Sequence, residues 1–172
     1  MLELILIAAV IAADQITKYL SELYLSPLGT SYPLIPGVFQ FTSVHNTGAA
    51  WGILRGFQVL FIPLTLLVCA FLAYAIIRYH KRLSVFSRIT LSLLFAGAVG
   101  NVIDRILFTY VRDFMDFCLI NFPVFNVADS ALTIGCICLV VDALFVKKRS
   151  IFETVFDGRK NAGKPPENSE HA

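Results

Sequence analysis

Four long apolar stretches dominate the sequence, at residues 2–22, 57–77, 86–107 and 127–146. Each has about the 20 residues that a helix needs to cross the hydrocarbon core of a bilayer. The stretch at 57–77 contains no charged residue, whereas each of the others holds at least two. The pattern predicts an all-α membrane protein with four transmembrane helices, three of which must turn charged side chains toward protein or water.

Basic residues are concentrated in two of the connecting segments. One group lies around the connection between the second and third stretches and the other follows the fourth: Arg78, Lys81, Arg82 and Arg88, then Lys147, Lys148 and Arg149. Because cytoplasmic loops carry an excess of Lys and Arg, we expect both termini inside and the connections 23–56 and 108–126 outside. The first stretch has no positively charged leader, so we expect a retained helix and not a cleaved secretory signal.

The first outer connection has strand character. Large apolar and polar residues alternate over 38–44, between Pro36-Gly37 and Gly48. Such alternation is typical of a half-buried strand. It predicts a small extracytoplasmic β-sheet region in the first outer loop.

The segment after the fourth stretch differs from the rest of the chain. Ser150-Ile151-Phe152-Glu153 has the form of a helix capping box beside the basic group. We therefore expect a four-helix domain over 1–149, a short interfacial helix over 150–156 on the inner leaflet, and a polar, disordered tail over 157–172.

The composition excludes several classes of protein. Hydrophobic residues make up 57% of the chain, charged residues 15%, and mean hydropathy is +0.73, which is incompatible with an ordinary soluble domain. A net charge of +2 without a basic face gives no basis for binding nucleic acid. The four cysteines and three histidines show neither a disulfide framework nor metal-ligand spacing, so we expect no metal and no other cofactor.

Two helical faces carry polar residues inside the predicted membrane. Asp14 and Lys18 are four residues apart and share a face of the first helix. The third helix has a stripe at helical spacing: Gly97, Gly100, Asn101, Asp104 and Arg105. Unpaired, the four charges would together cost on the order of 10 kcal/mol, so we expect them to be paired across the bundle. The glycines favour close helix packing, whereas the three polar residues fit packing and a substrate-lining role equally well.

Three carboxylates lie near the outer surface: Asp113, Asp116 and Asp129. Asn126 is placed to cap the fourth helix, with Asp129 at its third position, where the helix dipole favours an anion. Two carboxylates held together share one proton, so that one activates a water and the other protonates a leaving amine, as in aspartic proteases. The residues alone do not choose between Asp113 and Asp116 as the partner of Asp129.

Five motifs follow one another along the four predicted helices. They are Asp14-Gln15-Ile16-Thr17-Lys18, Asn46-Thr47-Gly48-Ala49-Ala50-Trp51-Gly52, the run from Gly97 to Arg105, Val111-Arg112-Asp113-Phe114, and the run from Phe122 to Ser130. In this order they closely resemble the lipoprotein signal peptidases, the signal peptidase II family, over nearly all of residues 1–146. The resemblance implies a bacterial intramembrane aspartic endopeptidase that removes signal peptides from diacylglyceryl-modified prolipoproteins, cutting before the lipid-modified cysteine.

The resemblance also implies roles for individual residues. By motif position, Asp113 and Asp129 are the catalytic pair. Seven further residues line or support the substrate site: Asp14, Lys18, Asn46, Gly48, Asn101, Arg105 and Asn126. Asp104 is expected to be a buried structural charge. The implied partners are modified prolipoproteins and membrane lipids, and we expect a monomer in the bacterial cytoplasmic membrane, with its site toward the outer leaflet and residues 46–52 as a lid.

The sequence departs from the family pattern at two positions. Ala96 stands where a further glycine is common, and Arg112 stands where an apolar residue is commoner. We expect the first to change helix packing slightly. Arg112 is adjacent to Asp113, so we expect this cation to lower the pKa of the Asp113 carboxyl. An ion pair of Asp113 with Arg112 or Arg105 is the corresponding structural explanation for the carboxylate.

Three other functions fit parts of the sequence. A small transporter or proton conductor would use the charges of the first and third helices as a relay, although the two halves of the chain show no repeat. A non-catalytic scaffold for lipoproteins or lipid would need grooves and no carboxylate pair. A thiol protease would depend on His45 and Cys118 of the outer connections.

Overall fold

The computed structural model describes residues 1–48, 58–146 and 149–157. Its long helices are α1 (Leu2–Tyr24), α2 (Gln58–Tyr79), α3 (Val85–Phe108) and α4 (Val127–Phe145). All four are long and apolar enough to cross a membrane. Each boundary lies within two residues of the predicted one, so the prediction of four transmembrane helices is confirmed.

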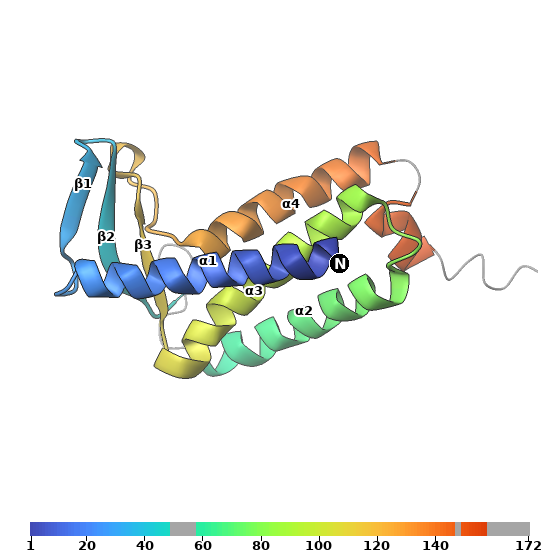
Figure 1. Ribbon diagram of the computed structural model, residues 1–172, viewed down its shortest axis with the longest axis horizontal. Coiled ribbons are helices and arrows are strands. Elements are labelled where there is room, and N and C mark those ends of the chain that lie inside the picture. The colour runs from blue at the N-terminus through green and yellow to red at the C-terminus, as the bar shows by residue number, and fades with distance from the viewer. Residues whose placement is uncertain (49–57, 147–148, 158–172) are drawn as a thin grey trace, which may run out of the picture.

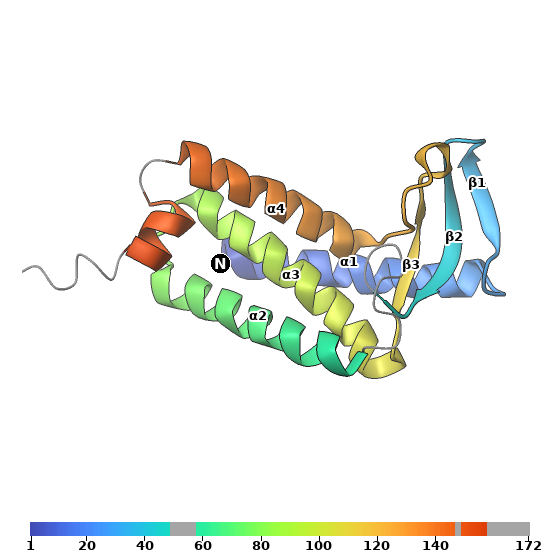
Figure 2. The same cartoon turned by 180° about the vertical axis from the view of Figure 1, so that it is seen from behind.

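Helix α3 is the central helix of the bundle and packs against each of the other three. Figures 1 and 2 show it between α2 and α4, with α1 on one side of the layer that they form. The protein buries 56% of the membrane-length window of α3, against 17–22% for the other helices. The polar stripe of α3 therefore faces protein and not lipid.

Glycines allow the neighbours of α3 to approach closely. A Cβ atom at Gly97 would lie 2.5 Å from the carbonyl oxygen of Ala128 on α4, and one at Gly100 would lie 2.7 Å from a carboxylate oxygen of Asp14 on α1. These contacts confirm the packing role predicted for both glycines.

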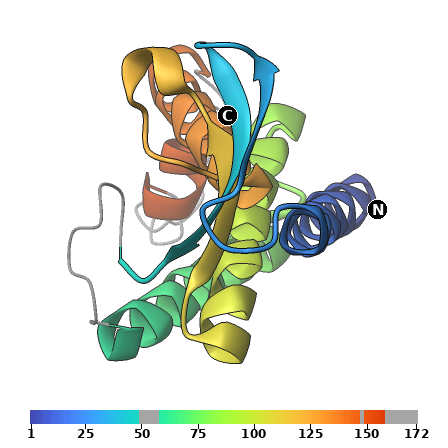
Figure 3. The same cartoon turned by 90° about the vertical axis from the view of Figure 1, so that its left-hand side faces the viewer.

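A three-stranded antiparallel sheet closes one end of the bundle. Its strands are β1 (Ser31–Ile35), β2 (Phe39–Asn46) and β3 (Val111–Asp116), in that spatial order. Figures 1 and 3 show the sheet at the end of the bundle where α1 and α3 finish and α4 begins. Strand β2 confirms the strand predicted in the first connection.

Strand β3 comes from the second connection and was not predicted. Its first four residues are all buried, although they include the adjacent charges Arg112 and Asp113. A strand buried on both faces lacks the alternation of polar and apolar residues by which a strand is found in a sequence. The sheet thus joins both of the connections that were expected outside the membrane.

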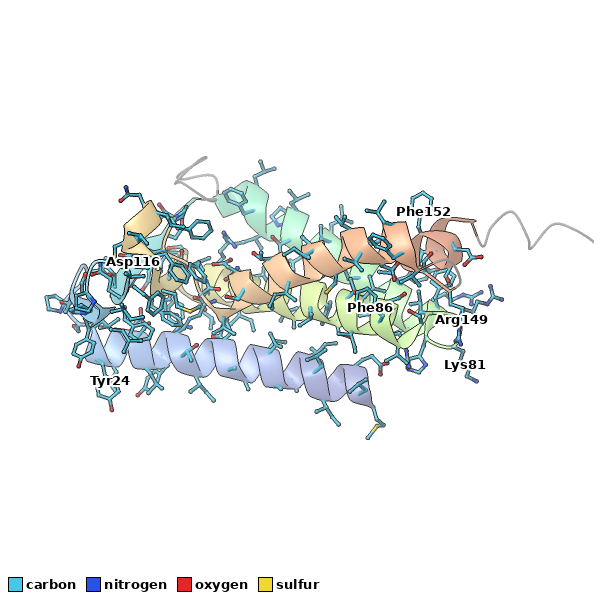
Figure 4. All side chains as sticks on the ribbon, turned by 90° about the horizontal axis from the view of Figure 1, so that it is seen from above. Tyr24, Lys81, Phe86, Asp116, Arg149 and Phe152 are labelled. Atoms are coloured by element: carbon cyan, nitrogen blue, oxygen red, sulfur yellow. The ribbon has the colours of Figure 1, made fainter. Side chains whose placement is uncertain are left out.

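A small apolar core joins α2, α3 and the C-terminal segment at the opposite end. Ile151 is buried in it against residues such as Leu91, and Val155 packs on its edge. The short π-helical segment η3 (Phe152–Asp157) overlaps the predicted interfacial helix. Phe152, however, is 61% exposed and points away from this core, as Figure 4 shows.

Labelled residues in Figure 4 mark the two ends of the molecule. Figure 4 places Asp116 and Tyr24 at the sheet end and Lys81 and Arg149 at the other. Arg149 binds the turn between α2 and α3, where it donates to the carbonyl oxygens of Lys81 and Arg82. Two further predicted basic residues, Lys147 and Lys148, and residues 158–172 of the predicted tail lie outside the described residues.

Candidate active site

A cavity of about 620 Å³ lies where the sheet, α3 and the start of α4 meet. Apolar side chains of the connection between β3 and α4, and of α4 itself, form much of its wall. Six of the nine predicted site residues form its polar part: Asn46, Gly48, Asn101, Arg105, Asp113 and Asp129. The other three, Asp14, Lys18 and Asn126, are fully buried beside these residues. The structure therefore brings the predicted site together.

Asp113 reaches the cavity from β3 and is only 2% exposed. Its two carboxylate oxygens accept hydrogen bonds from the side-chain amides of Asn46, at 2.9 Å, and Asn126, at 2.7 Å. Burial and the charge of nearby Asp129 raise the pKa of Asp113 to about 7. This carboxyl therefore gains or loses its proton near neutral pH.

Asp129 belongs to the capping box that starts α4. Its backbone N–H donates to the side-chain oxygen of Asn126 at 2.8 Å, and the backbone N–H of Asn126 donates to Oδ2 of Asp129 at 3.2 Å. The other carboxylate oxygen accepts a hydrogen bond from the Asn101 side chain at 2.7 Å. The predicted cap is confirmed, and Asn126 contacts both cavity carboxylates.

A buried ion pair supports these residues from α1. Nζ of Lys18 lies 2.8 Å from a carboxylate oxygen of Asp14, and both side chains are 0% exposed. Lys18 also donates to the side-chain oxygen of Asn101 at 3.0 Å. Asp14 accepts the backbone N–H of Ala128 at 2.8 Å, next to Asp129. The pair therefore fixes both the asparagine and the helix terminus that hold Asp129.

The end of β2 supplies Asn46 and Gly48. The backbone N–H of Gly48 donates to the side-chain oxygen of Asn46 at 2.9 Å, which leaves the amide nitrogen to bind Asp113. Arg105 donates to the carbonyl oxygen of Gly48 at 3.3 Å. Its Nε atom is buried and has no hydrogen-bond partner among the described residues. The remainder of the predicted lid, residues 49–52, lies outside that part of the chain.

Arg112 precedes Asp113 in the chain but does not bind its carboxylate. Successive side chains of a strand point to opposite faces, and the Arg112 guanidinium binds Asp104 through Nε at 3.1 Å and a terminal nitrogen at 2.8 Å. The expected lowering of the Asp113 pKa by Arg112 is therefore wrong, because the structure raises this pKa. Within the described residues, neither Arg112 nor Arg105 forms an ion pair with Asp113.

Asp104 is the buried structural charge that the sequence predicts. It is 0% exposed, and besides Arg112 it lies 3.5 Å from the Lys18 ammonium. The prediction that these intramembrane charges are paired across the bundle is thus confirmed for Lys18 and Asp104, whereas Asp14 pairs with Lys18 within α1. Arg105 forms a cation–π contact instead, with its guanidinium carbon 5.2 Å from the Phe61 ring centroid.

The structure separates Asp113 from Asp116, which the sequence alone did not. Asp116 accepts hydrogen bonds from Gln40, at 2.7 Å, and Thr42, at 3.2 Å, and is absent from the cavity wall. Side chains three positions apart along a strand point to opposite faces of the sheet, so Asp113 and Asp116 occupy opposite faces. Asp113 is the carboxylate that faces Asp129.

The thiol alternative finds no support in the geometry. The ring of His45 stacks on Tyr110 and lies 3.2 Å from a carboxylate oxygen of Glu22. Cys118 begins the short helix η2 (Cys118–Ile120), and its sulfur lies 3.8 Å from the carbonyl oxygen of Asp116. In the described part of the chain, no three His, Cys, Asp or Glu side chains are grouped as a metal site.

The family model described as Signal peptidase (SPase) II matches residues 6–145. The chain belongs to the signal peptidase II family. As a member of it the protein is a protease, and its four apolar helices make it a multi-pass membrane protein.

The chain is similar to known proteins along most of its length. The lipoprotein signal peptidase of Microcystis aeruginosa is 46% identical over 79% of this chain and 87% of its own. The lipoprotein signal peptidase of Brevibacillus brevis is 45% identical over 90% of this chain and 95% of its own. A bacterial membrane enzyme solved at 2.3 Å resolution superposes with a TM-score of 0.76 at 38% identity, over 86% of this chain and 92% of its own.

Gln15 contacts the candidate site but was not among the predicted site residues. Its amide nitrogen donates to Asp14, Asp104 and the carbonyl oxygen of Gly100, at 3.1 to 3.2 Å. Its oxygen accepts from Arg112 at 3.0 Å. Its position directly after Asp14 could have indicated a role in the site. The spacing rule for side-chain pairs on a helix selected Asp14 and Lys18, however, and did not select Gln15.

Proposed function

We propose that this chain is an aspartic endopeptidase that removes signal peptides from diacylglyceryl-modified prolipoproteins, cutting before the lipid-modified cysteine. One observation carries the proposal: Asp113 and Asp129 line the same cavity and are both hydrogen-bonded to Asn126. Two carboxylates that line one cavity and bind the same side chain favour a single shared proton. Family membership supports the same reaction, since its relatives are named lipoprotein signal peptidases.

The shared proton defines the proposed reaction. We assign it to Asp113, which has a pKa of about 7, and we assign the negative charge to Asp129 at the N-terminus of α4. Asp129 takes a proton from a water molecule, whose oxygen attacks the carbonyl carbon of the scissile peptide bond. Asp113 gives its proton to the leaving nitrogen as the C–N bond breaks. Transfer of the proton from Asp129 back to Asp113 restores the pair.

The other site residues hold these two groups and the substrate. Asn46 and Asn126 hold Asp113, and Asn101 holds Asp129. Asp14 and Lys18 hold Asn101 and the first turn of α4. The Nε atom of Arg105, which has no hydrogen-bond partner among the described residues, is assigned as a donor for a substrate carbonyl beside Gly48. The reaction requires water and no cofactor.

The cavity and the charge distribution support the proposed substrate and orientation. Phe117, Phe122 and Ile134 contribute apolar lining that suits a lipid-modified segment. The basic residues Lys81 and Arg149 at the far end support a cytoplasmic location for that end. We therefore place both termini in the cytoplasm and the active site toward the outer leaflet of the bacterial cytoplasmic membrane. There the enzyme acts as a monomer on prolipoproteins surrounded by lipid.

The decisive experiment measures release of the signal peptide from a diacylglyceryl-modified prolipoprotein by the purified enzyme in detergent. Asp113→Asn and Asp129→Asn each remove one ionisable group without changing side-chain volume, and we expect each to lower the rate by about 10²- to 10⁴-fold. Asp116→Asn is the matched control on the same strand, and we expect it to retain the wild-type rate. Thermal unfolding shows that each variant is folded.

The outcomes separate the proposal from its alternatives. If folded Asp113→Asn or Asp129→Asn cleaved at the wild-type rate, the catalytic pair would be wrong. Folded wild-type protein that bound the modified substrate without cutting it would be a scaffold.

A proton relay has no support in the cavity, because neither Asp104 nor Asp142 lines it. Asp142 is fully buried and accepts from Ser87 and the backbone N–H of Ile151.

A further inference from the structure

The two faces of the sheet contact different parts of the molecule near the cavity. In the register of β2 and β3, Val44 lies opposite Asp113 and His45 lies opposite Arg112. Asn46 and Asp113 point into the cavity and bind each other. His45 and Arg112 point the other way, to α1, where each lies within 3.5 Å of the Glu22 carboxylate. Alternate side chains of each strand therefore form the site on one face of the sheet and bind the sheet to α1 on the other face.

Arg112 is the main attachment on that second face. Its backbone N–H donates to Asp104 at 2.9 Å, and its guanidinium makes the bidentate contact with the same carboxylate. It also donates to Gln15 at 3.0 Å and to Glu22 at 3.5 Å. The ring of Phe108 lies 4.6 Å from the guanidinium carbon. One side chain thus joins α1, α3 and β3, and only 7% of it is exposed.

The partner of Arg112 is itself fixed to the site. Asp104 is 0% exposed and lies 3.5 Å from Nζ of Lys18. Lys18 in turn binds Asn101, and Asn101 binds Asp129. A continuous chain of hydrogen bonds and ion pairs therefore runs from the strand that carries Asp113 to the carboxylate of Asp129.

We infer that Arg112 is a positioning residue for the reaction: by binding Asp104, it holds β3 in the register that keeps Asp113 facing Asp129. The inference rests on the proposed aspartic mechanism. A slip of one residue would turn every side chain of β3 to the opposite face and remove Asp113 from the cavity. A buried ion pair often adds little net stability while fixing one arrangement among several. The fork geometry matters, because a lysine ammonium has one nitrogen and cannot form the two parallel N–H···O bonds that Arg112 makes with Asp104.

The test compares Arg112→Lys and Arg112→Leu with wild type in the cleavage assay, in which kcat, KM and the pH dependence of kcat are measured. We expect at least a tenfold loss of kcat in both variants, since small displacements of reacting groups have large effects on rate, while KM changes less than threefold. Asp113 faces Asp129, Lys18 and Arg105. If it leaves them, its pKa falls, so the alkaline limb of the profile moves to lower pH.

Arg88→Lys is the matched control. Arg88 forms a 2.7 Å ion pair with Glu3, which is 4% exposed, at the other end of the bundle. Its replacement disturbs a buried charge far from the cavity, so we expect a kcat within twofold of wild type and an unshifted profile. Arg112→Lys keeps a positive charge beside Asp104. If Arg112→Leu does not fold, the kcat and pH profile of Arg112→Lys alone test the inference.

Two results would overturn the inference. One is a folded Arg112→Lys with wild-type kcat and an unshifted alkaline limb. The other is equal loss of kcat in Arg112→Lys and Arg88→Lys, in proportion to the loss of folded protein, which would make Arg112 a stabilising residue only. Failure of the proposed function is distinct, because wild-type enzyme would then not cleave, or Asp113→Asn and Asp129→Asn would remain active.

Discussion

The side-chain nitrogen of Asn126 lies 2.7 Å from a carboxylate oxygen of Asp113, and the oxygen of the same amide accepts the backbone N–H of Asp129 at 2.8 Å. The group that starts α4 is therefore also the group that joins the two carboxylates. Serine caps helices about as well as asparagine but has no amide nitrogen for a second partner. Substitution at this position can separate the two roles.

We expect Asn126→Ser to keep the cap while losing the hydrogen bonds to Asp113 and Asn101. Each neutral hydrogen bond contributes about 0.5–1.5 kcal/mol, so loss of both should lower kcat by about 10- to 100-fold while Tm changes little. Asn126→Ala should lose a similar factor in kcat and also lower Tm by about 3 °C, because the cap is removed. Equal kcat in Asn126→Ser and wild type would show that the amide does not act on Asp113.

The rate of cleavage should depend on pH through Asp113. Its pKa is raised to about 7, and the proposed reaction needs one protonated and one ionised carboxyl. Above this pKa the pair carries two negative charges and lacks the acid, so kcat/KM should decline as pH rises through about 7. The profile of Asp116→Asn should match that of wild type. A rate that stays constant up to pH 9 would contradict the assignment of the shared proton.

Replacing Asp113 should stabilise the protein at neutral pH. The folded-state pKa of about 7 exceeds the ordinary value of 3.8, so the folded protein binds more protons between these values and loses stability as pH rises through that window. Asp113→Asn removes this loss. Its Tm should exceed that of wild type by about 10 °C at pH 8 and by much less at pH 4. A difference in Tm that did not vary with pH would contradict the raised pKa.

Gly100→Ala should impair activity through α1. The new Cβ atom would lie 2.7 Å from a carboxylate oxygen of Asp14 and 3.0 Å from Cβ of Ala128, so the buried pair with Lys18 must move. Overpacking of this kind costs about 1–3 kcal/mol, and we expect a fall in both Tm and kcat. In the control Gly135→Ala, the nearest atoms are Cδ2 and Cγ of the Leu94 side chain, 2.8 Å away, and Leu94 is not a site residue. That variant should keep its kcat, and equal losses in the two variants would argue against a specific effect on Asp14.

The sequence predicted the helices well because hydrophobic length and bilayer thickness constrain them directly. The cap at Asn126 was also predictable, since it depends on residues three positions apart in the chain. Strand β3 was not predictable, because its first four residues are all buried and its polar side chains are matched by distant partners. The same partners explain the wrong expectation for Arg112.

The choice between Asp113 and Asp116 needed three dimensions for a related reason. Both residues follow the same helix within a few positions, and both are carboxylates near one surface. The register of β3 against β2 decides which of them faces α4, and no local pattern reveals that register. The ion pair between Asp104 and Arg112 depends on the same register.

The capping box at Asn126 has a consequence for the order in which the protein is made. Asp113 leaves the ribosome before α4, whereas Asp129 and Asn126 become fixed only when the first turn of α4 forms. Under the proposed mechanism, a nascent chain that has inserted three helices carries an acid without its partner. Proteolytic competence would then begin with insertion of the last helix, so that an unfinished chain in the translocation machinery cannot cleave the precursors passing beside it.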